Sequence, residues 1–391
     1  MQENDNEFSP VAPKRFEGLK SALAQASRAF RKETPRPAYR KPEKDEPLAL
    51  PITLEGSKSQ QRKLTKIVNA MCESEAGCTI LEAAMEAGYA LRFDKSTVQE
   101  GIFGYADPCN MECVLNPQNS TEEAIVTLAH ELRHAYQFES PVIDSITTAK
   151  VDTKTKIITD RAMEADAESY GCLVAWELKE AGRPQTWNDF KGEFPEVAEP
   201  FETVYETTKD LKLARTAAFK GWYDNESRRD SYDQTHLEEL EGIAPNNMSK
   251  KLKSVPAEKI VKAICHDPQK SSYFTESPDI LESGKYLTVY SDTKKKLQKF
   301  FAERNTMVGR VPDTTVDNLP TIPRPKSKKK GKLVSKRAKP LYTIRAGSQA
   351  RKDEKTSLED RQAKAARIIQ DKKKEKAVTT ILNATKKGLS R

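Results

Sequence analysis

The chain has 391 residues, of which 37% are hydrophobic and 32% are charged, and its net charge is +8. This polar composition indicates one core of moderate size with much solvated sequence around it. No stretch approaches the roughly 18 apolar residues that a membrane-spanning helix needs. The polar start MQENDNEFSP also lacks the apolar segment of a signal peptide, so we expect a cytoplasmic protein.

The positive charge is concentrated at one end of the chain. Residues 321–391 carry 23 Lys and Arg against 6 Asp and Glu, a net of +17, so the first 320 residues carry a net of −9. Blocks of like charge are usually solvated arms, and we expect 321–391 to be a basic, largely disordered tail with a helix at 354–387. One interpretation is that the tail makes nonspecific contacts with nucleic acid or with an acidic partner. The alternative is a solvated tail with no dedicated partner.

The other end and the following segment contain the first predicted elements. Residues 1–53 hold many charges and prolines, which predicts a mostly disordered leader. Apolar spacing then predicts, in chain order, helices at 57–70 and 79–87 and strands at 90–93, 101–106 and 111–115.

The next helix has a clear start signal. Ser120 is followed three residues later by Glu123, which is the spacing of a capping box. Apolar residues at helical spacing then predict a helix over 121–138. A connecting segment follows at 139–159, with a polar, insertion-like stretch at 147–156.

The second half of the chain reads as mainly helical. Helices are predicted at 160–180, 199–223, 226–241 and 257–265, and no clear core pattern continues beyond about residue 292. We therefore expect a folded domain at 54–245 and a helical or irregular extension at 246–320.

The helix predicted at 121–138 carries a pair of histidines. His130 and His134 are four residues apart, so both imidazoles lie on one face and can bind one ion. Glu131 is placed to act as a general base for a metal-bound water. In this arrangement Leu132 faces the core and Arg133 faces solvent. The alternative is that the two histidines cap or pack an ordinary core helix.

A third ligand is available on the next predicted helix. Glu164 can supply a carboxylate oxygen, and Glu168, one turn later, can orient a histidine through its free ring N–H. Asp166 is our second choice of ligand. These three acids cannot all point inward, so part of this face is expected to be solvated. The small residues Ala162, Ala165 and Ala167 allow close approach of the two helices.

These residues carry a resemblance to known enzymes. An HExxH helix followed by Glu-x-x-x-(Asp/Glu) resembles the gluzincin group of zinc metallopeptidases. The segments TLAHELRHAYQ and RAMEADAESYG are similar to the minimal zincins of the ImmA/IrrE type and to bacterial metallopeptidase domains of unknown function. Those relatives often have Asp or Asn four residues after the ligand, where this chain has Glu168.

The resemblance implies an α+β fold, with a small antiparallel or mixed sheet, an active-site helix and a helical C-terminal half. It implies one Zn²⁺ ion bound by His130, His134 and Glu164, with Glu131 as the base. It also implies a protein or peptide substrate, extended against an edge strand near 111–115.

Peptide hydrolysis also needs a donor for the oxyanion. The candidates are Tyr232 and His236, four residues apart on the helix predicted at 226–241, or Tyr170; the alternative for His236 is an ordinary surface residue. We therefore interpret the chain as a zinc metallopeptidase. The alternative is a catalytically silent zincin-like binding or regulatory protein whose basic tail contacts nucleic acid or an acidic partner.

The chain has six cysteines, which we expect to be reduced because no export signal precedes them. Two loosely spaced pairs are candidates for a structural zinc site, although cysteines of the core are commoner. These pairs are Cys72 with Cys78 and Cys109 with Cys113.

Overall fold

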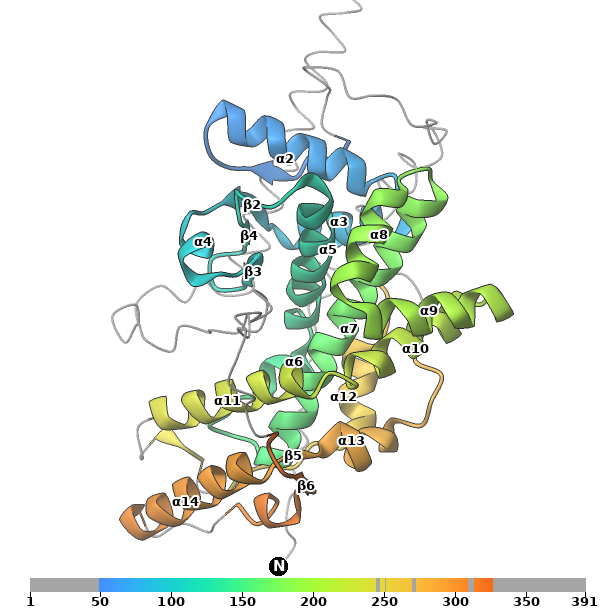
Figure 1. Cartoon of the computed structure of the whole chain (residues 1–391). Coiled ribbons are helices and arrows are strands. Elements are labelled where there is room, and N and C mark those ends of the chain that lie inside the picture. The colour runs from blue at the N-terminus through green and yellow to red at the C-terminus, as the bar shows by residue number, and fades with distance from the viewer. Residues whose placement is uncertain (1–48, 244–246, 250, 269–271, 309–312, 326–391) are drawn as a thin grey trace, which may run out of the picture. The chain divides into compact units, whose positions relative to one another are not determined.

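A computed structural model describes residues 49–243, 247–249, 251–268, 272–308 and 313–325, without the side chains of 305–308. The predicted leader, apart from 49–53, and the basic tail with its helix at 354–387 lie outside the described residues. The described part has the expected α+β fold, with a small mixed sheet and many helices (Figure 1).

The sheet has four strands in the order β1-β2-β4-β3. They are β1 (Thr53–Leu54), β2 (Ala90–Phe93), β3 (Gly104–Asp107) and β4 (Glu112–Leu115). β1 and β4 pair in parallel with β2, whereas β3 pairs antiparallel with β4. β4 therefore has a neighbour on both sides, so the prediction that residues 111–115 form the edge strand is wrong. In the described sheet, β3 is the edge next to β4.

Three helices surround the strands in the first part of the fold. They are α2 (Lys58–Met71), α3 (Glu75–Ala87) and α4 (Ser96–Glu100). α2 begins with a capping box of Ser57 and Gln60. α4 was not predicted. It comes shortly before β3, which begins at Gly104, whereas the sequence predicted a strand from residue 101 to 106.

Two long helices form the centre of the fold, α5 (Thr121–Phe138) and α7 (Thr153–Glu180), joined through α6 (Pro141–Ser145). α5 has the predicted bounds, and its capping box is formed. α7 begins at Thr153 because Asp152 accepts a hydrogen bond from the backbone N–H of Thr155 at 2.7 Å. The polar stretch 147–156 is thus partly the first turn of this helix, and it is not a solvated insertion.

α7 is buried on nearly all sides along most of its length. It contacts α5 on one side and the later helices α10 and α12 on others. Its small residues Ala162, Ala165 and Ala167 are buried, as their sequence pattern predicted. Because α7 carries charged residues and is covered on nearly all faces, these side chains need partners inside the protein; an unpaired buried charge would be costly.

Helices make up most of the remaining described chain. They are α8 (Pro184–Glu193), α9 (Pro195–Thr208), α10 (Leu211–Trp222), α11 (Glu226–Gly242), α12 (Ala257–Ile264), α13 (Gly284–Leu287) and α14 (Ser291–Val308), with short 3-10 turns at Pro278–Glu282 and Val316–Asn318. The predicted helix 199–223 is two helices. The chain turns at Lys209, which has a φ of 57°, and Asp210 caps α10.

The chain beyond residue 292 contributes to the core, contrary to the prediction. Leu297 and Phe301 of α14 are buried, as are Val316 and Leu319. Two short strands, β5 (Val289–Tyr290) and β6 (Thr321–Ile322), pair in parallel. They connect the residues just before α14 to the last described residues of the chain. Among the described residues, no helix is long and apolar enough to cross a membrane.

Candidate metal centre

α5 presents two histidines to the same point. His130 and His134 are both buried, and their Nε2 atoms lie 3.0 Å apart. Their rings meet edge to face, with centroids 4.7 Å apart. This arrangement follows from the four-residue spacing on one helix face.

α7 brings a carboxylate to these nitrogens. Oε1 of Glu164 lies 3.3 Å from Nε2 of His134, and Oε2 lies 3.5 Å from Nε2 of His130. Ligand atoms of His130, His134 and Glu164 all lie within 4.8 Å of one another. The structure thus brings together the three residues that the sequence predicted as ligands.

The three side chains are strongly coupled by charge. Burial disfavours the charged imidazolium of His130, but its hydrogen bond to Glu164 and the charges of Glu168 and Glu131 outweigh this and raise its pKa to about 9. Burial likewise acts to raise the pKa of Glu164, but His134 and the hydrogen bonds to both histidines lower it below its usual value. The carboxylate of Glu164 and the imidazole of His130 thus stabilise each other's charged forms.

Glu131 follows His130 directly on α5 and is buried. Its side chain is 1% exposed, and neither carboxylate oxygen has a hydrogen-bond partner among the described residues. Burial raises the pKa of Glu131 despite the nearby His130 and His134. Burial and the proximity of Glu131 also raise the pKa of the Cys113 thiol in β4.

Each histidine has a polar neighbour on its second ring nitrogen. Oε2 of Glu168 lies 3.6 Å from Nδ1 of His130, in the orienting position that the sequence suggested. Oε1 of Gln137 lies 2.8 Å from Nδ1 of His134. Gln137 was missed from the sequence, although its place three residues after His134 on one helix was a signal for this contact.

The candidate oxyanion donors have different surroundings. The hydroxyl of Tyr232, on α11, donates a 2.6 Å hydrogen bond to Oε2 of Glu164. Tyr170 instead donates to the carbonyl of Ala76 at 2.8 Å, so it does not point into the site as one alternative required.

His236 is buried, which contradicts the alternative of an ordinary surface residue. Neither of its ring nitrogens has a hydrogen-bond partner among the described residues. Burial and the charge of Lys156 lower its pKa to about 3. The role of His236 as a donor stays a prediction.

Behind the histidines lies a buried ion pair that the sequence reading missed. Arg133, expected to face solvent, is buried, and its Nε donates to Oδ2 of Asp166 at 2.6 Å. Glu164, Asp166 and Glu168 are all buried, so the expectation that part of this acidic face is solvated is wrong. The reason is that α7 is covered on opposite faces, and Asp166 has an arginine partner there.

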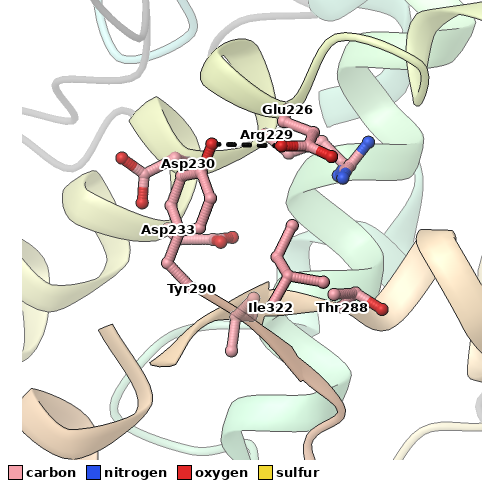
Figure 2. A pocket seen from close by; sticks show the side chains of 8 residues that line it. Glu226, Arg229, Asp230, Asp233, Thr288, Tyr290 and Ile322 are labelled. Carbon is pink, nitrogen blue, oxygen red and sulfur yellow. Dashed lines mark hydrogen bonds between the residues drawn. The ribbon is translucent and has the colours of Figure 1, made fainter. Parts of the chain in front are cut away.

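A pocket with about 160 Å³ of empty volume lies elsewhere, between α11 and the β5–β6 sheet (Figure 2). It is lined by Glu226, Arg229, Asp230, Asp233, Thr288, Val289, Tyr290 and Ile322. The hydroxyl of Tyr290 donates to Glu226 across it at 3.4 Å. No predicted ligand lines this pocket, so it is separate from the histidine cluster.

The cysteines give no support to a second metal site. In the described ranges, the one group of three or more His, Cys, Asp and Glu side chains with ligand spacing is His130, His134 and Glu164. None of the six cysteines is in a disulfide, and Cys113, Cys172 and Cys265 are buried.

Comparison with known proteins gives one match. Residues 40–274, more than half of the chain, match the family described as "Putative metallopeptidase family (DUF6782)". The chain belongs to this family. The DUF6782 match includes all three clustered residues and Glu131. No curated protein and no solved structure matches the chain.

Proposed function

We propose that this DUF6782 protein is a zinc-dependent metallopeptidase of the gluzincin type, with His130, His134 and Glu164 as the ligands. One observation carries the proposal. The Nε2 atoms of His130 and His134 lie 3.0 Å apart, and each lies close to a different carboxylate oxygen of Glu164, at 3.5 Å from Oε2 and 3.3 Å from Oε1. Tetrahedral zinc with bonds of about 2.0–2.1 Å has neighbouring ligand atoms about 3.3 Å apart. Two imidazoles and a carboxylate also suit zinc as a donor set.

Glu131 is the proposed general base. When bound, zinc polarises a water molecule and the scissile carbonyl of the substrate. Glu131 accepts the proton of the attacking water and delivers it to the leaving amine. The free carboxylate oxygens and the raised pKa of Glu131 support this role, because a base of this kind must hold a proton for part of the cycle.

The remaining assignments are parts of the same proposal. Glu168 orients His130 through its second nitrogen, and Tyr232 or His236 donates to the oxyanion. Tyr232 has the better support because its hydroxyl reaches a proposed ligand. A peptide substrate would pair with β3 rather than with β4, because β4 is hydrogen-bonded on both sides.

The test compares full-length wild type with Glu131→Gln, both loaded with zinc, on a diverse peptide mixture read by mass spectrometry. We expect cleavage by the wild type and a rate about 10²- to 10⁴-fold lower in the variant, with zinc retained. If both proteins hold zinc and neither cleaves any peptide, the alternative of a silent binding or regulatory protein is favoured.

A further inference from the structure

The side-chain amide of Gln137 has a fixed orientation. Its Nε2 donates to the carbonyl oxygen of Met163 at 3.0 Å and to Oδ2 of Asp166 at 2.7 Å. A carbonyl and a carboxylate accept hydrogen bonds only, so the NH₂ group of Gln137 must face them. The amide oxygen therefore faces His134, and the amide cannot flip without losing both bonds.

This orientation determines which nitrogen of His134 carries the proton. Oε1 of Gln137 is an acceptor and lies 2.8 Å from Nδ1 of His134, so Nδ1 must carry a hydrogen. In the neutral ring the lone pair is then on Nε2, which faces Glu164 and His130. A neutral imidazole in this tautomer is what a metal ligand requires.

Asp166 is itself held by several donors on three other segments. Oδ2 accepts from Nε of Arg133, and Oδ1 accepts from Nη2 of Arg133 at 3.0 Å, Nη2 of Arg215 at 3.1 Å and the hydroxyl of Tyr273 at 2.8 Å. Arg215 also contacts Asp267. The charges of Arg133 and Arg215 are thus balanced by those of Asp166 and Asp267.

The same cluster reaches a distant part of the chain. Nη2 of Arg133 donates to the carbonyl oxygens of Ile264 at 2.6 Å and His266 at 2.9 Å. These contacts join α5 to Ile264, the last residue of α12, and to His266 just after it. The family match ends at residue 274, directly after Tyr273.

We propose that Asp166 is a positioning residue for the metal centre. Through Gln137 it fixes the orientation and tautomer of His134, and Arg133, Arg215 and Tyr273 fix Asp166. Metal affinity therefore depends on the hydrogen bond of Tyr273, which is 139 residues after His134 in the chain. This inference rests on the proposed metal-binding function and adds residues that contact no metal.

The chain offers a matched pair of variants for the test. Tyr273 and Tyr170 are both buried, and each hydroxyl donates one hydrogen bond of 2.8 Å. Only the hydroxyl of Tyr273 reaches Asp166, whereas that of Tyr170 reaches the carbonyl of Ala76. Tyr273→Phe and Tyr170→Phe thus each remove one buried hydroxyl and keep the ring, but only Tyr273→Phe removes a hydrogen bond to Asp166.

The experiment measures the Kd of Zn²⁺ for the full-length protein by competition with a chromophoric chelator. Thermal unfolding of the metal-free protein and the visible spectrum of the Co²⁺ form are recorded alongside. For Gln137→Met we expect Zn²⁺ binding about 10- to 100-fold weaker and an altered Co²⁺ spectrum. Tyr273→Phe should weaken Zn²⁺ binding about threefold or more, whereas Tyr170→Phe should bind Zn²⁺ as the wild type does although it also loses a buried hydrogen bond and some thermal stability.

Two results would contradict the proposed positioning role of Asp166. One is wild-type Zn²⁺ affinity in both Gln137→Met and Tyr273→Phe, and the other is equal weakening in the two tyrosine variants. If Gln137→Met does not fold, the Zn²⁺ affinities of Tyr273→Phe and Tyr170→Phe are sufficient to test this role. A wild-type protein that binds no zinc contradicts the proposed function itself, whereas the two results above contradict only the role of Asp166.

Discussion

The hydroxyl of Tyr232 lies 2.6 Å from Oε2 of Glu164 and donates a hydrogen bond to it. Tyr232 belongs to α11, nearly 70 residues after the carboxylate on α7. Burial and the charge of Glu164 raise the pKa of Tyr232 well above its usual value, so the phenol stays protonated and remains a donor. The contact fixes one carboxylate oxygen of Glu164, and the ring of Tyr232 packs against Trp222 with centroids 5.7 Å apart.

Replacing Tyr232 by Phe removes this hydrogen bond and keeps the ring. A hydrogen bond to a buried charged group contributes about 1.5–3 kcal/mol. If Tyr232 turns its single O–H from Glu164 to the oxyanion in the transition state, kcat falls about 10- to 100-fold in Tyr232→Phe while Zn²⁺ binds with little change. If it only orients Glu164, the Zn²⁺ affinity falls and kcat at saturating zinc is kept. Steady-state kinetics and a zinc titration on the same preparation separate the two.

The buried pair of Arg133 and Asp166 should dominate stability in this part of the fold. Arg133→Ala removes one of the arginine partners of the buried Asp166. Breaking a buried ion pair in this way lowers the free energy of unfolding by about 3–5 kcal/mol. The control is Arg183→Ala, which removes a bidentate pair with Glu73 that is nearer the surface. Such a pair contributes about 0–1 kcal/mol. Urea unfolding that shows equal losses in both variants would argue against this ranking.

The histidine helix could be predicted from sequence because its signals are local. The capping box of Ser120 and Glu123 and the spacing of His130 and His134 lie within one helix, and α5 has the predicted bounds. Glu164 could be proposed because a carboxylate on the next helix completes a known type of donor set. Each of these inferences needed information from only one or two adjacent elements.

Other features depend on contacts that no local pattern contains. Arg133 looks like a surface residue until Asp166 and the carbonyl of Ile264 are placed beside it. The start of α7 reads as polar linker because Lys156 is charged, yet Asp160 accepts from its ammonium group at 2.6 Å. β4 looked like an edge strand because the order of strands in a sheet is not visible in the order of the chain.

The basic tail gives a prediction that needs no structure. Residues 326–391 carry 22 Lys and Arg against 6 Asp and Glu. If the tail contacts nucleic acid through phosphates, binding of the full chain must weaken steeply as salt rises, because bound counterions are released. A chain that ends at residue 325 should lose this binding and keep its metal content. Binding that is independent of salt, or of the tail, would contradict the electrostatic account.

The central claim is that His130, His134 and Glu164 hold one metal ion, and elemental analysis of the purified full-length protein tests it most directly. Wild type and Glu131→Gln should each contain about one zinc per chain, and His134→Ala and Glu164→Ala should contain little. Glu202→Ala, which removes a carboxylate that pairs with Lys179 and Lys191 outside the cluster, is the control and should retain the ion. Equal zinc in all five proteins, or none in the wild type, would contradict the account.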